Sequence, residues 1–235
     1  MALINNIYEP FQRKFRPRRL RLFFSLMNIG PQTKVLDLGG GAFFWDLALT
    51  EGLALPMVTV LNNRPAGSQA RDYLTWILGD ARHTKFADQS FDVVFSNSLI
   101  EHLGDWDSQM QFANEVRRLA PRYFVQTPNL HFPVEPHLVT PFIHWLPKSM
   151  RRRMIRNFTV WGLTKRPSQS YCEELWKELA LLSAKQMQIL FPDSRLIIER
   201  FLALPKSIVA IRNSGQVAEA GRKDVVIAEL RLRDQ

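Results

Sequence analysis

The chain has 235 residues, enough to bury a substantial hydrophobic core in one domain or two small ones. Its 46% hydrophobic and 11% aromatic content excludes intrinsic disorder, its single cysteine excludes an internal disulfide, and it has no apolar run of about 18 residues that would predict a membrane span. The net charge of +9 favours an anionic partner, either a membrane surface or nucleic acid.

The first 32 residues are predicted to form a basic amphipathic segment ahead of the folded domain. The basic residues of Arg13–Arg21 alternate with apolar ones such as Phe15 and Leu20, and they follow a weak apolar stretch, which is the wrong order for a secretory signal. Such a mixture can lie on an anionic membrane surface or bind the phosphates of nucleic acid. It can equally be a solvated basic face over an ordinary core-facing stripe, so three interpretations stay open.

Beyond residue 32, short apolar runs alternate with stretches that have apolar residues at helical spacing. Strands are predicted at 34–38, 57–61, 73–78, 91–97 and 122–127, and helices at 43–52 and 106–120. Helical stretches are predicted near 148–158 and 171–190, and an antiparallel pair of strands at 194–202 and 207–212. The polar stretch 213–235, in which only 224–230 resembles a strand, is predicted to be a tail.

The alternation of strands and helices predicts an α/β fold. Specifically, we expect a Rossmann-like doubly wound sheet, mostly parallel with an antiparallel final strand. The predicted domain spans 33–212 and carries an insert at 128–165. In a sheet of this kind the ligand lies beyond the carboxyl ends of the central strands.

Three glycines, Gly39, Gly40 and Gly41, follow the first predicted strand directly. Glycine in that place permits a tight turn and a close approach of a ligand to the backbone, and the amides that open the next helix face that ligand. A dinucleotide site needs a third glycine and an acid after the second strand, where this chain has Phe44 and Asn62. The pattern therefore argues against a dinucleotide.

The segments "VLDLGGG", "VTVLN", "GDA" and "FDVVFSNSLIEHL", in this order and at these intervals, together resemble the class I S-adenosylmethionine-dependent methyltransferases. The resemblance covers about Thr33 to Thr127 and extends more loosely to Arg212. It implies S-adenosyl-L-methionine as cofactor and methyl transfer as the reaction. It also implies three groups of cofactor-binding residues: Asp37, Gly39 and Gly41 at the methionine end, Asn62 at the ribose, and Asp80 and Ala81 at the adenine. Ser96 to Leu99, including Asn97, would line the methionine and substrate side.

The chain departs from this family at two positions. Phe43 stands where the third glycine of D-x-G-x-G-x-G would be, and Asn62 stands where the family usually has Asp or Glu. An amide is a weaker acceptor for ribose hydroxyls than a carboxylate, by about 1 kcal/mol, and Asn63 and Arg64 are close enough in sequence to assist. A non-catalytic binding protein on the same fold is therefore one alternative.

The insert "TPNLHFPVEPHLVTPFIHWLPKSMRR" follows the fifth strand at its carboxyl end, where a substrate should lie. It resembles a Pro-Asn … Phe-Pro-x-Glu-x-His pattern in a subset of bacterial class I methyltransferases, and its prolines are expected to prevent regular sheet. Histidine is the side chain best suited to take a proton from an acceptor near neutral pH. The predicted catalytic residues are His137, Glu135 and His102, and the predicted substrate-binding residues are Asn129, His131 and Phe132.

Two of these predictions have alternatives. His102 also suits a core or capping role. His131, Glu135 and His137 are residue types that bind metals, but their spacing matches no established zinc pattern, so no metal site is predicted.

The predicted function is methyl transfer to a small, hydrophobic or lipid-linked acceptor, because the insert is rich in apolar residues and the basic residues of Arg151–Arg156 follow it. We expect a cytoplasmic protein that can be peripheral on the inner face of the membrane, with no obligate protein partner evident. The second candidate, a nucleic-acid methyltransferase, is favoured by charge alone, since no Asn-Pro-Pro-Tyr motif follows the fourth strand.

Overall fold

The computed structural model describes residues 16–135, 140–147, 179–213 and 228–230, with the shorter pieces 150, 154, 157–159, 162–163 and 166–168. The predicted helix near 148–158 lies largely outside these residues. So do residues 171–178 of the predicted stretch 171–190, and so do His137 and the N-terminal end of the basic segment.

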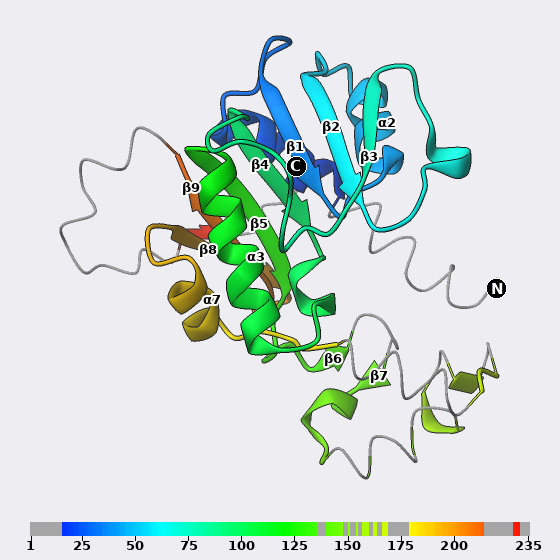
Figure 1. Ribbon diagram of the computed structural model, residues 1–235. Helices are drawn as coiled ribbons and strands as arrows, with labels where there is room; N and C mark the ends of the chain where they lie inside the picture. Colours follow the sequence, from blue (N-terminus) through cyan, green and yellow to red (C-terminus); the bar gives the residue numbers. More distant parts are fainter. Residues whose placement is uncertain are drawn as a thin grey trace.

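Eight of the described strands form one sheet in the order β10-β8-β9-β5-β4-β1-β2-β3 (Figure 1). Their bounds are β1 Lys34–Leu38, β2 Met57–Asn62, β3 Leu74–Leu78, β4 Val93–Asn97, β5 Arg122–Pro128, β8 Arg195–Phe201, β9 Leu204–Arg212 and β10 Ala228–Leu230. Within this described sheet only β9 runs antiparallel, against both β5 and β8. The predicted Rossmann-like, mostly parallel sheet is confirmed.

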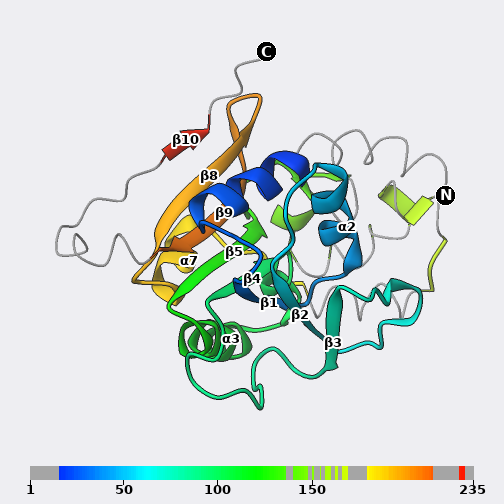
Figure 2. The same ribbon diagram turned by 90° about the horizontal axis from the view of Figure 1, so that it is seen from above.

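Helices cover both faces of the sheet (Figure 2). The helices α3 (Trp106–Leu119) and α7 (Ala184–Leu190) pack on one face, and α2 (Ala42–Thr50) and the helical residues 16–26 pack on the other. Short 3₁₀ turns, η1 (Gly67–Gln69), η2 (Ile100–His102) and η3 (Ile143–Trp145), lie in the connections. No helix among the described residues is both long and apolar enough to span a bilayer.

An aromatic cluster joins the second pair of helices to the sheet. Phe23 packs edge to face with Trp45, at 6.3 Å between ring centroids, and Phe44 stacks on Phe95 at 4.5 Å. Phe95 in turn stacks on Phe124 of the neighbouring strand. Of the three aromatic residues that follow the glycine turn, Phe44 and Trp45 begin the buried face of α2, which explains their place in the sequence.

The N-terminal basic segment is part of this core where the structure describes it. Leu20, Phe23 and Met27 are fully buried against the sheet, and Arg19 is buried with them. The apolar stripe of residues 16–27 therefore packs on the protein itself and is not available to a membrane. For these residues the structure favours the third interpretation, except that Arg19 is not solvated.

Three further expectations are corrected. The predicted helix over 171–190 is wrong for residues 179–183, because Ser183 caps α7 in a capping box with Gln186 and starts a new helix there. The predicted tail contains β10, which pairs with β8. The prolines of the insert do not exclude sheet, since β6 (Val134–Glu135) and β7 (Thr140–Pro141) form a two-residue ladder.

Candidate functional site

A cleft of about 1320 Å³ opens at the carboxyl ends of β1, β2, β3 and β4. Of the predicted site residues, it is lined by Gly39, Gly41, Asn62, Asp80, Ala81 and His102. Other lining residues were not predicted as cofactor ligands, among them Gln69, Trp76, Leu78 and Arg82. The glycine turn and the ends of three further strands therefore meet around one cavity, as the sequence pattern predicts.

The turn between β1 and α2 has no room for side chains. Gly39 has a φ of +75°, and its N–H donates to the carbonyl of Leu61 at 2.8 Å. A Cβ on Gly40 would lie 1.9 Å from Oδ2 of Asp37, and a Cβ on Gly41 would lie 2.2 Å from Oε1 of Gln69. Gly39 is thus required by its backbone conformation and Gly40 by its contact with Asp37, whereas a side chain on Gly41 would displace the end of Gln69.

Asp37 lies directly beneath the turn and is fully buried. Its Oδ2 accepts a hydrogen bond of 2.9 Å from Nε1 of Trp45, whereas Oδ1 has no hydrogen-bond partner among the described residues. Burial raises the pKa of Asp37 to about 7, and the bond from Trp45 opposes that rise. A carboxyl group with one unsatisfied oxygen under a glycine turn suits a ligand that brings a hydrogen-bond donor.

Asn62 ties two loops of the cleft together. Its Nδ2 donates to the carbonyl of Gly40 at 2.8 Å, and its Oδ1 accepts from the backbone N–H of Arg64 at 3.1 Å. The amide does what a carboxylate could not do, because a carboxylate has no N–H to give to Gly40. Its predicted role toward ribose hydroxyls stays a prediction, and part of its hydrogen-bonding capacity is already used by Gly40 and Arg64.

Gln69 contacts the start of α2, a position that sequence reasoning missed. Its Oε1 accepts from the backbone N–H of Ala42 at 3.2 Å, so it supplies the cap that the N-cap residue Gly41 lacks. The loop is fixed to α2 because Arg71 donates to both carboxylate oxygens of Asp46, at 3.0 and 2.8 Å. No local sequence pattern predicts this contact, because it joins residues 27 positions apart.

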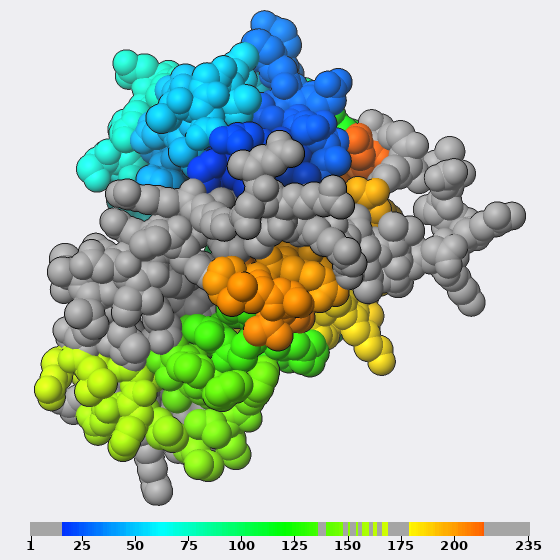
Figure 3. All heavy atoms as spheres, turned by 180° about the vertical axis from the view of Figure 1, so that it is seen from behind, coloured from blue at the N-terminus to red at the C-terminus, as the bar shows by residue number. Residues whose placement is uncertain are grey.

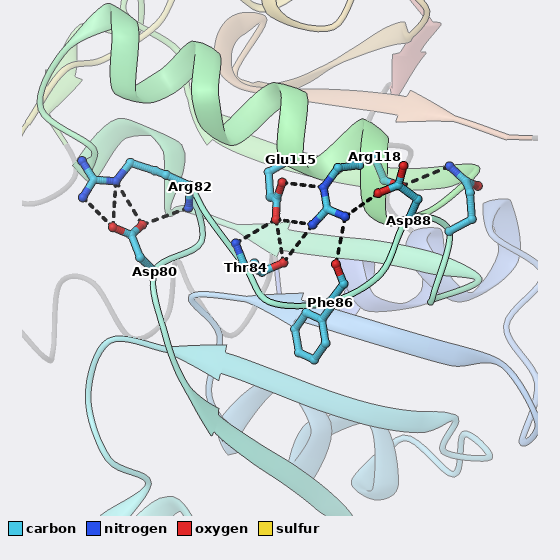
Figure 4. A network of polar contacts seen from close by, with 8 residues as sticks. Asp80, Arg82, Thr84, Phe86, Asp88, Glu115 and Arg118 are labelled. Carbon is cyan, nitrogen blue, oxygen red and sulfur yellow. Dashed lines mark hydrogen bonds and ion pairs between the residues drawn. The ribbon is translucent and has the colours of Figure 1, made fainter.

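The loop after β3 forms the opposite wall and is stiffened by ion pairs (Figure 4). Both the guanidinium group and the backbone N–H of Arg82 donate hydrogen bonds to the carboxylate of Asp80, which lowers the pKa of Asp80. Glu115 and Arg118 of α3 bind the following residues, with Thr84 donating to Glu115 at 2.8 Å from its backbone and 2.6 Å from its hydroxyl. Asp80 is thus presented to the cleft from a loop anchored on α3.

The residues after β4 divide between the cleft and the interior. Ser98, at φ +63°, and His102 line the cleft, and Leu99 packs against Gly39. Asn97, a predicted cofactor residue, instead accepts a hydrogen bond of 2.7 Å from Arg19 and does not line the cleft. Its side chain leaves β4 on the face covered by the helical residues 16–26, which is why it points away from the glycine turn.

A second polar group lies at the same edge of the sheet, and we name it the Arg19 cluster: Arg19, Asn97, Gln126, Glu199 and Ser207. Arg19 donates to Gln126 at 3.0 Å and forms a two-pronged ion pair with Glu199, which also accepts from Ser207. Burial alone would raise the pKa of Glu199, but the charge of Arg19 lowers it overall. Sequence reasoning missed this cluster, since Arg19 and Glu199 are 180 positions apart.

The Arg19 cluster extends toward the cleft and toward the insert. Ser98 of the cleft donates to the same Gln126 oxygen at 3.0 Å. On the other side Lys206 is partly buried, and burial, aided by the charge of Arg19, lowers its pKa to about 7. The carboxyl ends of β4 and β5 are thereby linked by one hydrogen-bonded network.

The predicted insert residues that the structure describes do not line the cleft. Asn129 is buried and binds the backbone of His131 and Lys206, Phe132 is buried, and Glu135 is fully buried. His131 is exposed, and His137 lies outside the described residues. Among the residues that the structure does describe, no three His, Cys, Asp or Glu side chains cluster as metal ligands would. Their catalytic and substrate roles stay predictions.

The residues of the cleft fit the cofactor that the resemblance implies. Leu61, Leu78 and Ala81 offer apolar surface to a base, and the amides of Asn62 and Gln69 suit hydroxyls. Asp37, a predicted cofactor residue, is fully buried beneath the turn and does not itself line the cleft. The lining combines apolar side chains with a few polar amides, as small-molecule sites usually do.

Comparison with known proteins agrees with this geometry. A family model described as a methyltransferase domain matches residues 48–122, which is less than half of the chain. No curated protein has a matching sequence. The chain spans 60% of the length of an Anabaena variabilis protein described as a methyltransferase of an antibiotic biosynthesis pathway, and the two structures superpose with a TM-score of 0.44.

Three solved structures are similar over most of the chain. One is the protein described as a methyltransferase in a Haloferax volcanii complex with the Trm112 methyltransferase activator (13% identity, 90% of this chain and 95% of that chain, TM-score 0.51). Another is the PH0226 protein of Pyrococcus horikoshii OT3 (19%, 88% and 90%, 0.51). The third is the N-terminal domain of EvdMO1 with S-adenosylhomocysteine (SAH) bound (16%, 84% and 80%, 0.50). Residues 48–122 are therefore similar to a methyltransferase domain, and the sheet that contains them has the Rossmann-like fold of these neighbours.

Proposed function

We propose that this protein transfers a methyl group from S-adenosyl-L-methionine to a small, hydrophobic or lipid-linked acceptor. The observation that carries the proposal is the glycine turn over Asp37, which opens into a cleft that also reaches Asn62 and Asp80. The methyltransferase-domain match and the SAH bound to the EvdMO1 domain support the choice of cofactor.

In this proposal the turn at Gly39–Gly41 lies against the methionine end of the cofactor. The amide of Gln69, which lines the cleft, supplies a polar contact there, and Asp37 supports the turn from beneath. Asn62 serves the ribose with the hydrogen-bonding capacity that Gly40 and Arg64 leave, and the anchored loop of Asp80 borders the adenine.

The cofactor when bound supplies an electrophilic sulfonium methyl group, so the protein has mainly to align the acceptor and exclude water, an effect that can contribute about 7–11 kcal/mol. Ser98, Leu99 and His102 line the end of the cleft next to β4. They are therefore placed to border the acceptor. His102 can take the proton of an acceptor hydroxyl or amine, because histidine is the side chain best suited to that role and His102 lines the same cavity. Asn129 and Glu135, which the sequence predicts at the acceptor, are buried outside the lining of this cleft, so we assign them no contact with the acceptor there.

An apolar acceptor is favoured over nucleic acid by the composition of the insert, where Phe132 and Ile143 are buried and Phe142 and Trp145 are exposed. The proposal also places the protein in the cytoplasm. A nucleic-acid methyltransferase would instead need surface cations, and of the described part of Arg13–Arg21 the structure buries and pairs Arg19, while Arg21 is exposed but paired with Glu51.

The test is incubation of the purified protein with radiolabelled S-adenosylmethionine and, separately, with a lipid extract or RNA of its host. Label in the lipid fraction that is lost in the His102→Ala variant is the expected result. Label in RNA would favour the second candidate. Binding of SAH without labelling of any fraction would favour the non-catalytic alternative.

A further inference from the structure

Part of the insert displays aromatic side chains outward on a fixed backbone. Phe142 and Trp145 are 54% and 49% exposed, whereas Ile143 and His144 between them are buried. Figure 3 shows the yellow-green atoms of the described insert residues at the end of the molecule away from the blue and cyan atoms of β1 and β2. The two rings contact each other, with centroids 5.3 Å apart.

The backbone fixes the outward position of the Phe142 ring. Phe142 has a φ of +59°, a conformation unfavourable for a bulky side chain, and its N–H donates to the carbonyl of Pro133 at 2.7 Å. Strain of this kind persists only where surrounding contacts impose it. Burial of the Phe142 ring in the core would be the ordinary outcome, so its fixed outward position indicates a use.

Trp145 is prepared for an apolar environment. Its Nε1 donates to the carbonyl of Leu130 at 2.9 Å, and the same carbonyl lies 3.1 Å from Nε2 of His144. Because the indole N–H is satisfied within the protein, the exposed ring can leave water without losing a hydrogen bond. Met150, Phe158 and Leu163, further along the insert, are also about half exposed or more.

The charge of this part of the chain identifies the kind of surface that it suits. Between Pro136 and Cys172 the sequence has seven Lys and Arg residues and no Asp or Glu: Lys148, Arg151, Arg152, Arg153, Arg156, Lys165 and Arg166. Apolar rings together with a uniformly basic sequence match an anionic bilayer, in which rings enter the interface and cations meet lipid headgroups.

We propose that the insert face formed by Phe142 and Trp145 docks on an anionic lipid membrane, a choice that the basic sequence of 148–166 favours by its charge. This inference rests on the proposed function and deepens it, because it states where a lipid-linked acceptor is met. The apolar stripe of residues 16–27 takes no part in the docking, since it is buried in the core.

Flotation with phosphatidylcholine vesicles, with and without phosphatidylglycerol, tests the proposal on the full chain. The wild type should float with the anionic vesicles and lose binding as salt is raised. The double variant Phe142→Ser/Trp145→Ser should lose about tenfold or more of its partition coefficient. Met57→Ser is the matched control, because Met57 is also 54% exposed but lies at the amino end of β2, and it should float like the wild type.

The triple variant Arg151→Ala/Arg152→Ala/Arg153→Ala gives an independent check that leaves the aromatic rings in place. It should lose its preference for the anionic vesicles. Absence of flotation by the wild type, equal flotation of the double variant, or binding of RNA but not of vesicles would each overturn the proposal. SAH titrations on the same preparations separate the two claims: flotation without SAH binding contradicts only the proposed function, and SAH binding without flotation contradicts only the docking.

Discussion

The cleft and the Arg19 cluster lie at the same edge of one sheet, yet they treat their polar groups in opposite ways. In the cluster, Arg19 is paired with Glu199, Asn97 and Gln126, and all of these but the half-buried Asn97 are buried. Beneath the glycine turn of the cleft, Asp37 is fully buried but keeps an oxygen without a partner among the described residues. Buried polar groups that are fully paired hold a structure together, whereas an unpaired one points to a ligand.

The same difference appears in the pKa values. Burial raises the pKa of Asp37 to about 7, because Trp45 gives it only one neutral hydrogen bond. Glu199 is buried as well, but the charge of Arg19 overcomes burial and lowers its pKa. The carboxylate of the cluster is therefore stabilised in its charged form, and the carboxyl group of the cleft in its neutral form.

The largest expected effect comes from breaking the cluster. Arg19→Met leaves Glu199 buried without its cation and should lower the free energy of unfolding by about 3–5 kcal/mol. Urea denaturation measures the loss. Arg21→Met is the control, because Arg21 lies on the same helix as Arg19 but is exposed and pairs with Glu51 at the end of α2. This variant should lower the free energy of unfolding by less than about 1 kcal/mol. Equal losses in the two variants would contradict the distinction.

The next effect separates the two buried carboxyl groups by pH. Because the pKa of Asp37 is higher in the folded than in the unfolded protein, its contribution to stability is present below pH 4 and is lost as the pH rises to about 7. The loss is on the order of 3–4 kcal/mol. Asp37→Asn keeps an acceptor for Trp45 and should remove this decline, measured as the difference between the unfolding curves of the two proteins from pH 4 to pH 8. Parallel curves would show that Asp37 does not titrate in this range.

The glycine turn should resist the smallest side chain. Gly40→Ala places a methyl group against Asp37 and should cost about 1–3 kcal/mol of stability, together with a loss of SAH affinity of at least tenfold. Gly30→Ala provides the control, since Gly30, like Gly40, does not have a positive φ but has open space around it, and it should leave SAH affinity unchanged. Calorimetric titration of both variants decides the matter, and unaltered affinity in Gly40→Ala would argue against a ligand at the turn.

The smallest effect concerns the loop that covers the turn. Gln69→Ala removes the acceptor for the N–H of Ala42 and one polar group of the cleft, so SAH affinity should fall about fivefold, which is about 1 kcal/mol. Gln188→Ala on α7 removes a comparable amide far from the cleft and should have no effect on affinity. A gain of affinity in Gln69→Ala would instead mean that Gln69 competes with the ligand.

The cleft could largely be predicted from the sequence, and the Arg19 cluster could not. The order of strands, the glycine turn and the residues after β2 and β3 follow from local patterns, because each strand end and each turn is encoded by neighbouring residues. Arg19 was grouped with surface cations because its partners come from three distant strands. Gln69 has the same difficulty, as its contact with α2 depends on how the loop folds back.

The insert shows the same limit. Its position after β5 was predicted, but Glu135 is buried and Phe142 is exposed, which no periodicity in so proline-rich a segment would indicate. Where alternation of apolar and polar residues is absent, the direction of each side chain is set by tertiary contacts such as the bond from Trp145 to Leu130.

The central claim is that the glycine turn above Asp37 binds an adenosyl sulfonium cofactor. Isothermal titration of the wild-type protein with SAH, at pH 6 and pH 8, measures it most directly. We predict saturable heat at one site per chain and a higher melting temperature in the presence of SAH. Absence of both heat and thermal protection at saturating SAH would contradict the claim and leave only a Rossmann-like fold without this ligand.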